Sequence, residues 1–114
     1  MKKKISVILT NNMIKEIHLR MMEDGYSLRE KSKWVSEAIE DFFKLKEYNS
    51  LVEIAGLADD FEKRETVYIS AELYEKLEEA IIHVRKQYPW LEGVKSLIIR
   101  ASIVRKLVVL GKRE

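Results

Sequence analysis

Apolar residues recur along the chain with two different spacings. In the segment 4–9 the odd-numbered positions are all apolar, whereas the even-numbered positions hold Lys4, Ser6 and Ile8. This alternation has the period of a β-strand, in which successive side chains point to opposite faces. The segment therefore predicts a short strand with one apolar face.

Two segments with helical spacing follow this strand. Thr10 is a candidate N-cap, and apolar residues then recur three or four positions apart, which predicts a helix over about 11–24. Ser27 and Glu30 have the spacing of a capping box, in which the side chain of each residue accepts a hydrogen bond from the backbone amide of the other. The apolar residues beyond them recur again at three and four, which predicts a second helix over about 28–47.

The same order of elements then returns. Residues 48–63 form a connector, in which a central apolar stretch can make one short helix. The run Thr-Val-Tyr-Ile at 66–69 predicts a second strand, and Ser70 is the N-cap candidate of a third helix that ends before Pro89. A last helix is expected over about 94–110. The chain is thus an internal repeat of element order, strand, helix, helix.

A lone short strand cannot satisfy its own backbone groups, so the two strands are expected to pair. The predicted fold class is mostly α with a short antiparallel two-stranded β-ribbon. We expect a first unit over 1–47, the connector over 48–63 and a second unit over 64–114. The connector is long enough for the two units to pair within one chain as a single pseudo-dimeric domain.

The periodicity also predicts a core. The inner strand positions, the aromatic residues of the second helix, and the methionines are expected to be buried. They are Ile5, Val7, Leu9, Val67, Ile69, Trp34, Phe42, Phe43, Met1, Met13, Met21 and Met22. Trp90, which follows Pro89, is expected to be a packed loop residue.

Composition narrows the chemistry. The chain has no cysteine, which excludes disulfides and thiolate metal sites. His18 and His83 have no second ligand three or four residues further along the chain, so we expect no metal and no cofactor. No catalytic motif stands out, and an enzyme is not expected. No stretch is long and apolar enough for a membrane span, so the expected location is the cytoplasm, at the nucleoid or in a host cell.

Charge is distributed unevenly along the chain. Residues 1–35 carry eight Lys and Arg against four Asp and Glu, residues 36–80 five against thirteen, and residues 81–114 eight against two. The ends are therefore basic and the middle acidic. Folding can bring both basic ends to one face, where they would attract a polyanion. The alternative is that solvated helix faces simply segregate by charge.

The run from Lys4 to Thr10, the helix closed by Gly25, and the segment SKWVSEAI at 32–39 resemble the MetJ-, Arc- and CopG-like ribbon-helix-helix family. The resemblance covers about 5–46 well and 64–110 less well. A version with two ribbon-helix-helix motifs in one chain is similar to conjugation accessory proteins and to archaeal-virus transcription regulators.

The resemblance implies that a β-ribbon enters the major groove of double-stranded DNA and reads its sequence. The implied function is a transcriptional regulator, with repression as the expected mode. Two alternatives stay open, namely a DNA-binding accessory factor in conjugation, replication or partition, and an antitoxin-type interaction module.

The resemblance also assigns residues. The outward strand positions would read base edges, and they are Lys4, Ser6, Ile8, Arg64, Thr66 and Tyr68. Arg64 is the strongest candidate for reading guanine, because its guanidinium can donate two hydrogen bonds to one base. Glu65 stands where the first strand has Ile5, so the second strand is expected to be shorter or frayed at its start.

The same resemblance implies phosphate contacts at the basic N-terminus and at the start of each unit's second helix. The residues concerned are Lys2, Lys3, Ser27, Arg29, Lys31, Ser32, Lys33, Lys95 and Ser96. The last helix is apolar in almost every direction, which predicts burial on more than one side. We expect one of these sides to form a homodimer or a higher homo-oligomer.

Overall fold

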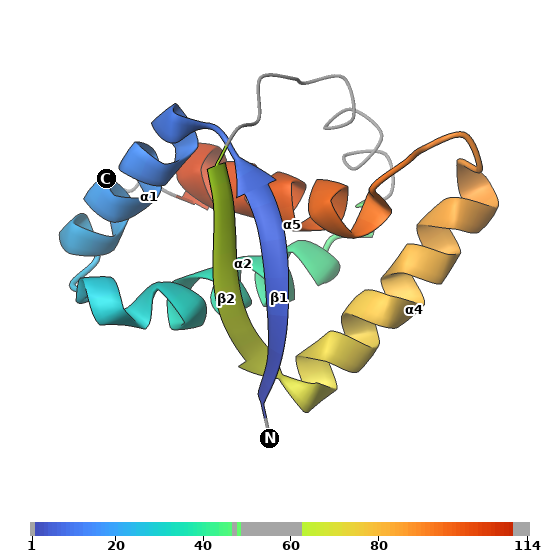
Figure 1. Ribbon diagram of the computed structural model, residues 1–114, viewed down its shortest axis with the longest axis horizontal. Helices are drawn as coiled ribbons and strands as arrows, with labels where there is room; N and C mark the ends of the chain where they lie inside the picture. The colour runs from blue at the N-terminus through green and yellow to red at the C-terminus, as the bar shows by residue number, and fades with distance from the viewer. Residues whose placement is uncertain (1, 47, 49–62, 111–114) are drawn as a thin grey trace.

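The computed structural model describes residues 2–46, 48 and 63–110, and within these ranges the order strand, helix, helix occurs twice (Figure 1). The elements are β1 (Lys2–Leu9), α1 (Asn11–Glu23), the 3₁₀ turn η1 (Leu28–Glu30), α2 (Lys31–Phe43), β2 (Lys63–Ser70), α4 (Ala71–Gln87), α5 (Val94–Arg105) and the π-helical turn η2 (Lys106–Leu110). The predicted class, mostly helical with a short antiparallel ribbon, is confirmed. The short helix predicted inside the connector lies outside the described residues.

The two strands pair antiparallel over eight residues each, in a register that places Ser6 opposite Thr66. The second strand is as long as the first, so the expectation of a shorter or frayed β2 is wrong. Glu65 keeps its place on the inner face because the Lys31 ammonium lies 2.6 Å from its carboxylate. This partner offsets the cost of placing a charge over the core.

Both strands run directly into a helix through the same kind of cap. The Thr10 hydroxyl accepts a hydrogen bond from the Met13 amide at 3.0 Å, and the Ser70 hydroxyl accepts one from the Leu73 amide at 3.1 Å. Each cap satisfies one of the amides that the first helical turn leaves without a partner. The two predicted N-caps are therefore confirmed, and the two strand-to-helix junctions have the same local structure.

The core lies between the inner face of the ribbon and the two central helices. α2 and α5 pass behind the ribbon, and α1 and α4 flank them on the two sides (Figure 1). The five inner strand residues predicted to be core are all buried, as are Trp34 and Phe42. Among the described residues, no helix covers the opposite face of the ribbon.

The apolar character of the last helix is explained within one chain. α5 packs against α2, α4 and β1. Its buried residues are Val94, Leu97, Ile98, Ile99, Ala101, Ser102 and Ile103. The predicted burial on several sides is thus confirmed, and the intramolecular core accounts for most of it. Val104 and Val108 remain exposed, and the predicted homo-oligomer stays a prediction.

Two core predictions are wrong. Met22 is 67% exposed, because it follows the fully buried Met21 and one residue turns the helix direction by about 100°. Trp90 is 65% exposed, and its ring lies edge-on to that of Tyr88. Met13 and Phe43 are half-buried at the margin of the core, while Met1 lies outside the described residues.

The second helix also differs from its predicted bounds. It begins with the 3₁₀ turn η1, and its α-helical part ends at Phe43, before residue 47. The ring of Tyr48 packs against Phe43 at 5.4 Å between centroids, so aromatic contacts close this end of the helix. None of the helices in the described ranges could cross a membrane.

Candidate nucleic-acid interface

The outer face of the ribbon brings together the six residues predicted to read bases. They form three cross-strand pairs, Lys4 with Tyr68, Ser6 with Thr66, and Ile8 with Arg64. Partners in such pairs lie on the same side of a sheet. Residues that are 56 to 64 positions apart in the sequence therefore share one surface, which we call the outer face.

The outer face has an approximate two-fold arrangement. Ser6 and Thr66 hold equivalent places four residues before the matching N-caps Thr10 and Ser70, and they stand opposite one another at its centre. On either side of this hydroxyl pair lies one cation with one large apolar residue. One end pairs Lys4 with Tyr68, and the other pairs Arg64 with Ile8.

These side chains have the chemistry of base recognition. Lysine and arginine donate to the O6 and N7 atoms of guanine, and hydroxyls can pair with several bases. Ile8 and the Tyr68 ring offer apolar surface to a thymine methyl group. Tyr68 is 48% exposed, which leaves its ring available.

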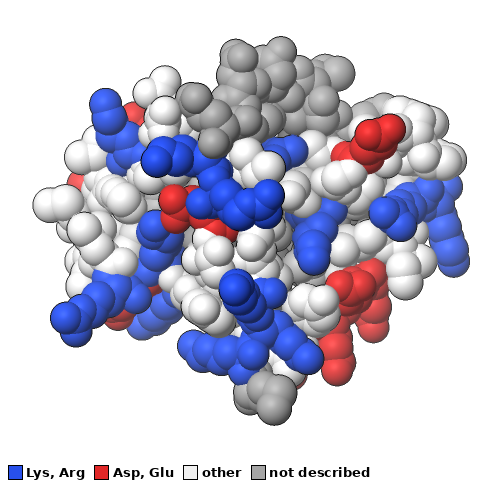
Figure 2. Space-filling model, viewed as in Figure 1, with Lys and Arg blue, Asp and Glu red and all other residues white. Residues whose placement is uncertain are grey.

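Positive charge extends beyond the outer face. Basic side chains gather along the ribbon and around its lower end (Figure 2). Lys2 and Lys3 are exposed at the end of the ribbon where β1 begins, and Lys63 is exposed at the other end, opposite Leu9. The Lys3 ammonium lies 5.7 Å from the centre of the Tyr74 ring. Acidic side chains gather over α4 instead, whose exposed carboxylates are those of Glu72, Glu75, Glu78 and Glu79. One flank of the ribbon is therefore acidic.

The start of α2 carries most of the predicted phosphate contacts. Ser27, Arg29 and Lys33 are exposed, and Lys33 lies 5.8 Å from the centre of the Tyr26 ring. The capping box predicted from the sequence is present. The Ser27 amide donates to the Glu30 carboxylate at 2.8 Å, and this bond lowers the pKa of Glu30.

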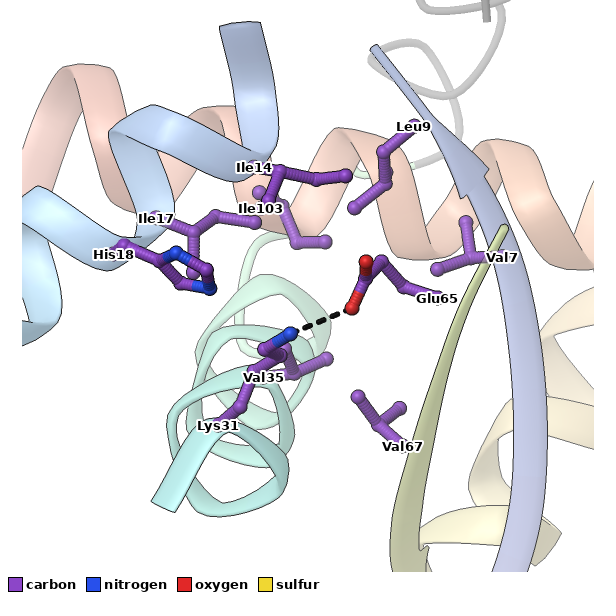
Figure 3. Close-up of a pocket in the computed structure, with 10 residues that line it drawn as sticks. All are labelled: Val7, Leu9, Ile14, Ile17, His18, Lys31, Val35, Glu65, Val67 and Ile103. Atoms are coloured by element: carbon purple, nitrogen blue, oxygen red, sulfur yellow. Dashed lines mark hydrogen bonds and ion pairs between the residues drawn. The ribbon is translucent and has the colours of Figure 1, made fainter. Parts of the chain in front are cut away.

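Two other residues of this group have partners inside the protein. The Ser32 hydroxyl accepts a hydrogen bond from the backbone amide of Tyr68 at 2.9 Å. The Lys31 side chain reaches beneath the ribbon to Glu65, in a small hollow lined mainly by apolar residues (Figure 3). The hollow is lined by Val7, Leu9, Ile14, Ile17, His18, Lys31, Val35, Glu65, Val67 and Ile103.

The start of α5 is built differently. Gly93 precedes the helix with φ +61°, in the left-handed region, and no side chain caps the first amides. Lys95 and Ser96, the two residues predicted to contact phosphate, are half-buried. The first turn holds no acidic residue.

Sequence reasoning missed one basic residue beneath the ribbon. The Arg100 guanidinium, carried by α5, donates to the backbone carbonyl of Ile8 at 3.0 Å. Burial lowers the pKa of Arg100, because the charged form loses solvation. The signal in the sequence was a cation within an otherwise apolar helix, but the partner lies 92 positions away.

A polar cluster holds the other side of α2. The Tyr26 hydroxyl donates to the Glu37 carboxylate, and the Lys106 ammonium lies 3.5 Å from the same carboxylate. Lys106 also lies 5.1 Å from the centre of the buried Trp34 ring. The cluster ties the turn before α2 to the end of the last helix, and so supports the base of the interface.

The described ranges contain no group of three or more residues suited to hold a metal ion. A comparison of the chain with protein-family models, curated proteins and solved structures finds no match.

Proposed function

We propose that this chain binds double-stranded DNA in a sequence-specific manner, with the outer face of its ribbon in the major groove, and that it acts as a transcriptional regulator rather than an enzyme. One observation carries the proposal. The six residues predicted to read bases form three adjacent pairs on the ribbon face that no described helix covers. The major groove is about 12 Å wide and admits a two-stranded ribbon.

The proposal includes two ribbon-helix-helix motifs in tandem, folded as an intramolecular pseudo-dimer. The repeated element order, the matching caps at Thr10 and Ser70, and the central pair of Ser6 and Thr66 all favour it. In this arrangement one chain supplies the ribbon that single-motif proteins assemble from two.

The placement of the second helices supports phosphate contacts on both sides of the groove. The N-terminal ends of α2 and α5 lie on opposite sides of the ribbon (Figure 1). Helix N-termini favour anions, because free amides and the helix dipole point at them. Such contacts fix the register of the protein on DNA without reading the sequence.

The two sides would not contribute equally. The α2 side presents the exposed cations Arg29 and Lys33, whereas the other flank carries the exposed carboxylates of α4. We therefore propose a site with two unequal halves, of which the half near α2 is held more tightly. Occupying such a site near a promoter would repress transcription by excluding other proteins.

The proposal is tested by selecting bound sequences from a random pool of duplex DNA at two salt concentrations. We expect a short motif to be enriched at both. Overall affinity should fall with salt, because phosphate contacts release counterions. Ser6→Ala and Thr66→Ala should each weaken the sequence preference with little change in stability. If no motif is enriched, or if both variants keep the full preference, the assignment of the outer face is wrong.

A further inference from the structure

The backbone amides and carbonyls of the outer-face residues are directed away from the partner strand, towards the edges of the ribbon. In an antiparallel pair, residues alternate between positions that exchange ladder hydrogen bonds and positions that do not. Tyr68 belongs to the second kind, because its amide donates to Ser32 on α2 instead of to β1. The alternation then places Lys4, Ser6, Ile8 and their partners all at such positions. Their amides and carbonyls are directed to the ribbon edges.

A two-stranded ribbon therefore holds its inner residues better than its outer ones. Ile5 and Val67, which face the core, lie at positions of the kind that exchanges ladder bonds and are also fixed by packing. Outer-face residues have neither support from the ladder nor packing above them. A reader must be held within a fraction of an ångström of its base, so another support is needed.

The structure shows such a support at both edges. On the β2 edge, the Ser32 hydroxyl accepts from the Tyr68 amide at 2.9 Å. On the β1 edge, the Arg100 guanidinium donates to the Ile8 carbonyl at 3.0 Å. Tyr68 and Ile8 hold equivalent places, each two residues before its N-cap, Ser70 or Thr10. Each is held by the second helix of the other unit.

We propose that Ser32 and Arg100 are positioning residues, which set the places of Tyr68 and Ile8 for base recognition without touching a base themselves. The inference rests on the proposed function and adds to it the source of the ribbon's rigidity. The two supports act on different ends of the outer face. Ser32 governs the end with Lys4 and Tyr68, and Arg100 governs the end with Arg64 and Ile8.

The first measurement needs no DNA. In Ser32→Ala, hydrogen exchange of the Tyr68 amide, followed by NMR, should become about three- to tenfold faster, the effect of losing one net hydrogen bond. The amide of Met13, held by the Thr10 cap, should be unchanged. Ser32→Thr keeps the hydroxyl and should restore slow exchange. Unchanged exchange at Tyr68 in Ser32→Ala would overturn the role of Ser32.

The second measurement is the DNA selection, with Tyr68→Ala and Ile8→Ala used to assign the base pair under each residue. Ser32→Ala should relax the preference under Tyr68 about tenfold and leave that under Ile8. Arg100→Lys keeps the positive charge but replaces the forked guanidinium with a shorter side chain that ends in an ammonium. This variant should relax the preference under Ile8 about tenfold and leave that under Tyr68. Ser36→Ala, half-buried one turn further along α2, is the matched control and should change neither.

The outcomes are distinguishable. Loss of preference that is spread evenly over the site, with circular dichroism showing an intact fold, would mean that the two residues stabilise the domain without positioning particular readers. If the unaltered chain enriches no sequence at all, the proposed function fails. The exchange measurement still decides in that case whether Ser32 holds the ribbon edge.

Discussion

The unit over residues 2–43 and the unit over residues 63–110 share their strand-to-helix junction but differ in the second helix. α2 begins with a capping box and exposed cations, and only one of its faces is buried. α5 begins at a left-handed glycine and is buried on several sides. The two units thus have the same order of elements, but their second helices differ. The N-terminal end of α2 is exposed, whereas α5 lies at the centre of the core.

The difference shows how a duplicated pattern becomes asymmetric inside one chain. Two units that share an order of elements need a common core but not two identical contributions to it. α5 supplies much of that core, which leaves the start of α2 free to present Arg29 and Lys33 to solvent. The same asymmetry appears in the ribbon, where Glu65 takes the place equivalent to Ile5.

The strongest test of this comparison removes core volume from each unit. Phe42→Ala should lower the free energy of unfolding by about 3–5 kcal/mol, and Ile98→Ala by about 2–5 kcal/mol, because both residues are fully buried. Denaturant titration should show a single transition in each variant, since the core is shared. Two separate transitions would mean that the units fold independently.

The ion pair beneath the ribbon is the next difference to remove. Lys31→Met leaves the Glu65 carboxylate over the apolar hollow without its partner and should cost about 2 kcal/mol, less than a fully buried pair because both side chains are partly exposed. Combining it with Glu65→Ile restores the residue type of the first strand and should recover the full stability. A double variant that remains as unstable as Lys31→Met would contradict this account.

The two ends of the outer face can be compared through their cations. Arg64→Lys should reduce discrimination at its base pair about tenfold, because a lysine cannot bond guanine in a bidentate manner. Lys4→Arg is the converse variant and should sharpen discrimination at the other end. Competition between single-base variants of the selected site measures both. Equal loss of affinity for all sequences in Arg64→Lys would assign that residue to phosphate instead.

The smallest expected effect concerns the hydrogen bond between Tyr26 and Glu37, both of which belong to the first unit. The hydrogen bond to Glu37 and burial raise the pKa of Tyr26 from 10.0 to about 12. Because the folded-state pKa lies above the unfolded value, the stabilisation is fully present below about pH 10 and is lost as the pH rises towards 12. Partial exposure limits it to about 1 kcal/mol.

Tyr26→Phe provides the control for this pH dependence. The difference in unfolding free energy between the unaltered chain and Tyr26→Phe should be constant up to about pH 9 and should shrink above pH 10. Chemical denaturation at a series of pH values measures it. A difference that stays constant up to pH 12 would show that the phenol and the Glu37 carboxylate are not coupled.

Local patterns were sufficient to predict much of the fold. The alternation around Ile5 and Val7 and the caps at Thr10 and Ser70 depend on neighbours a few positions away, and the structure confirms each of them. The same patterns misplaced Met22 and Trp90, because hydrophobic character alone does not say whether a partner surface lies opposite.

The contacts that shape the candidate site were not predictable in this way. The pairs Lys31 with Glu65, Ser32 with Tyr68, and Arg100 with Ile8 join residues 34, 36 and 92 positions apart. Each pair needs two polar atoms within about 3 Å, and periodicity carries no information about distances across the fold. The resemblance placed Lys31 and Ser32 near phosphate, while the structure shows that both also have partners in β2.

The amino-acid sequence by itself determined the order of elements, the apolar face of each strand and the six residues of the outer face, because these depend on the period of side chains along a strand or helix. Only the tertiary structure decided that Ser6 meets Thr66, that α5 lies at the centre of the core, and that Ser32 and Arg100 hold the ribbon edges. Those features depend on the register and packing of segments distant in the chain, where backbone groups left without partners in a two-stranded ribbon take whichever donor or acceptor the fold brings near.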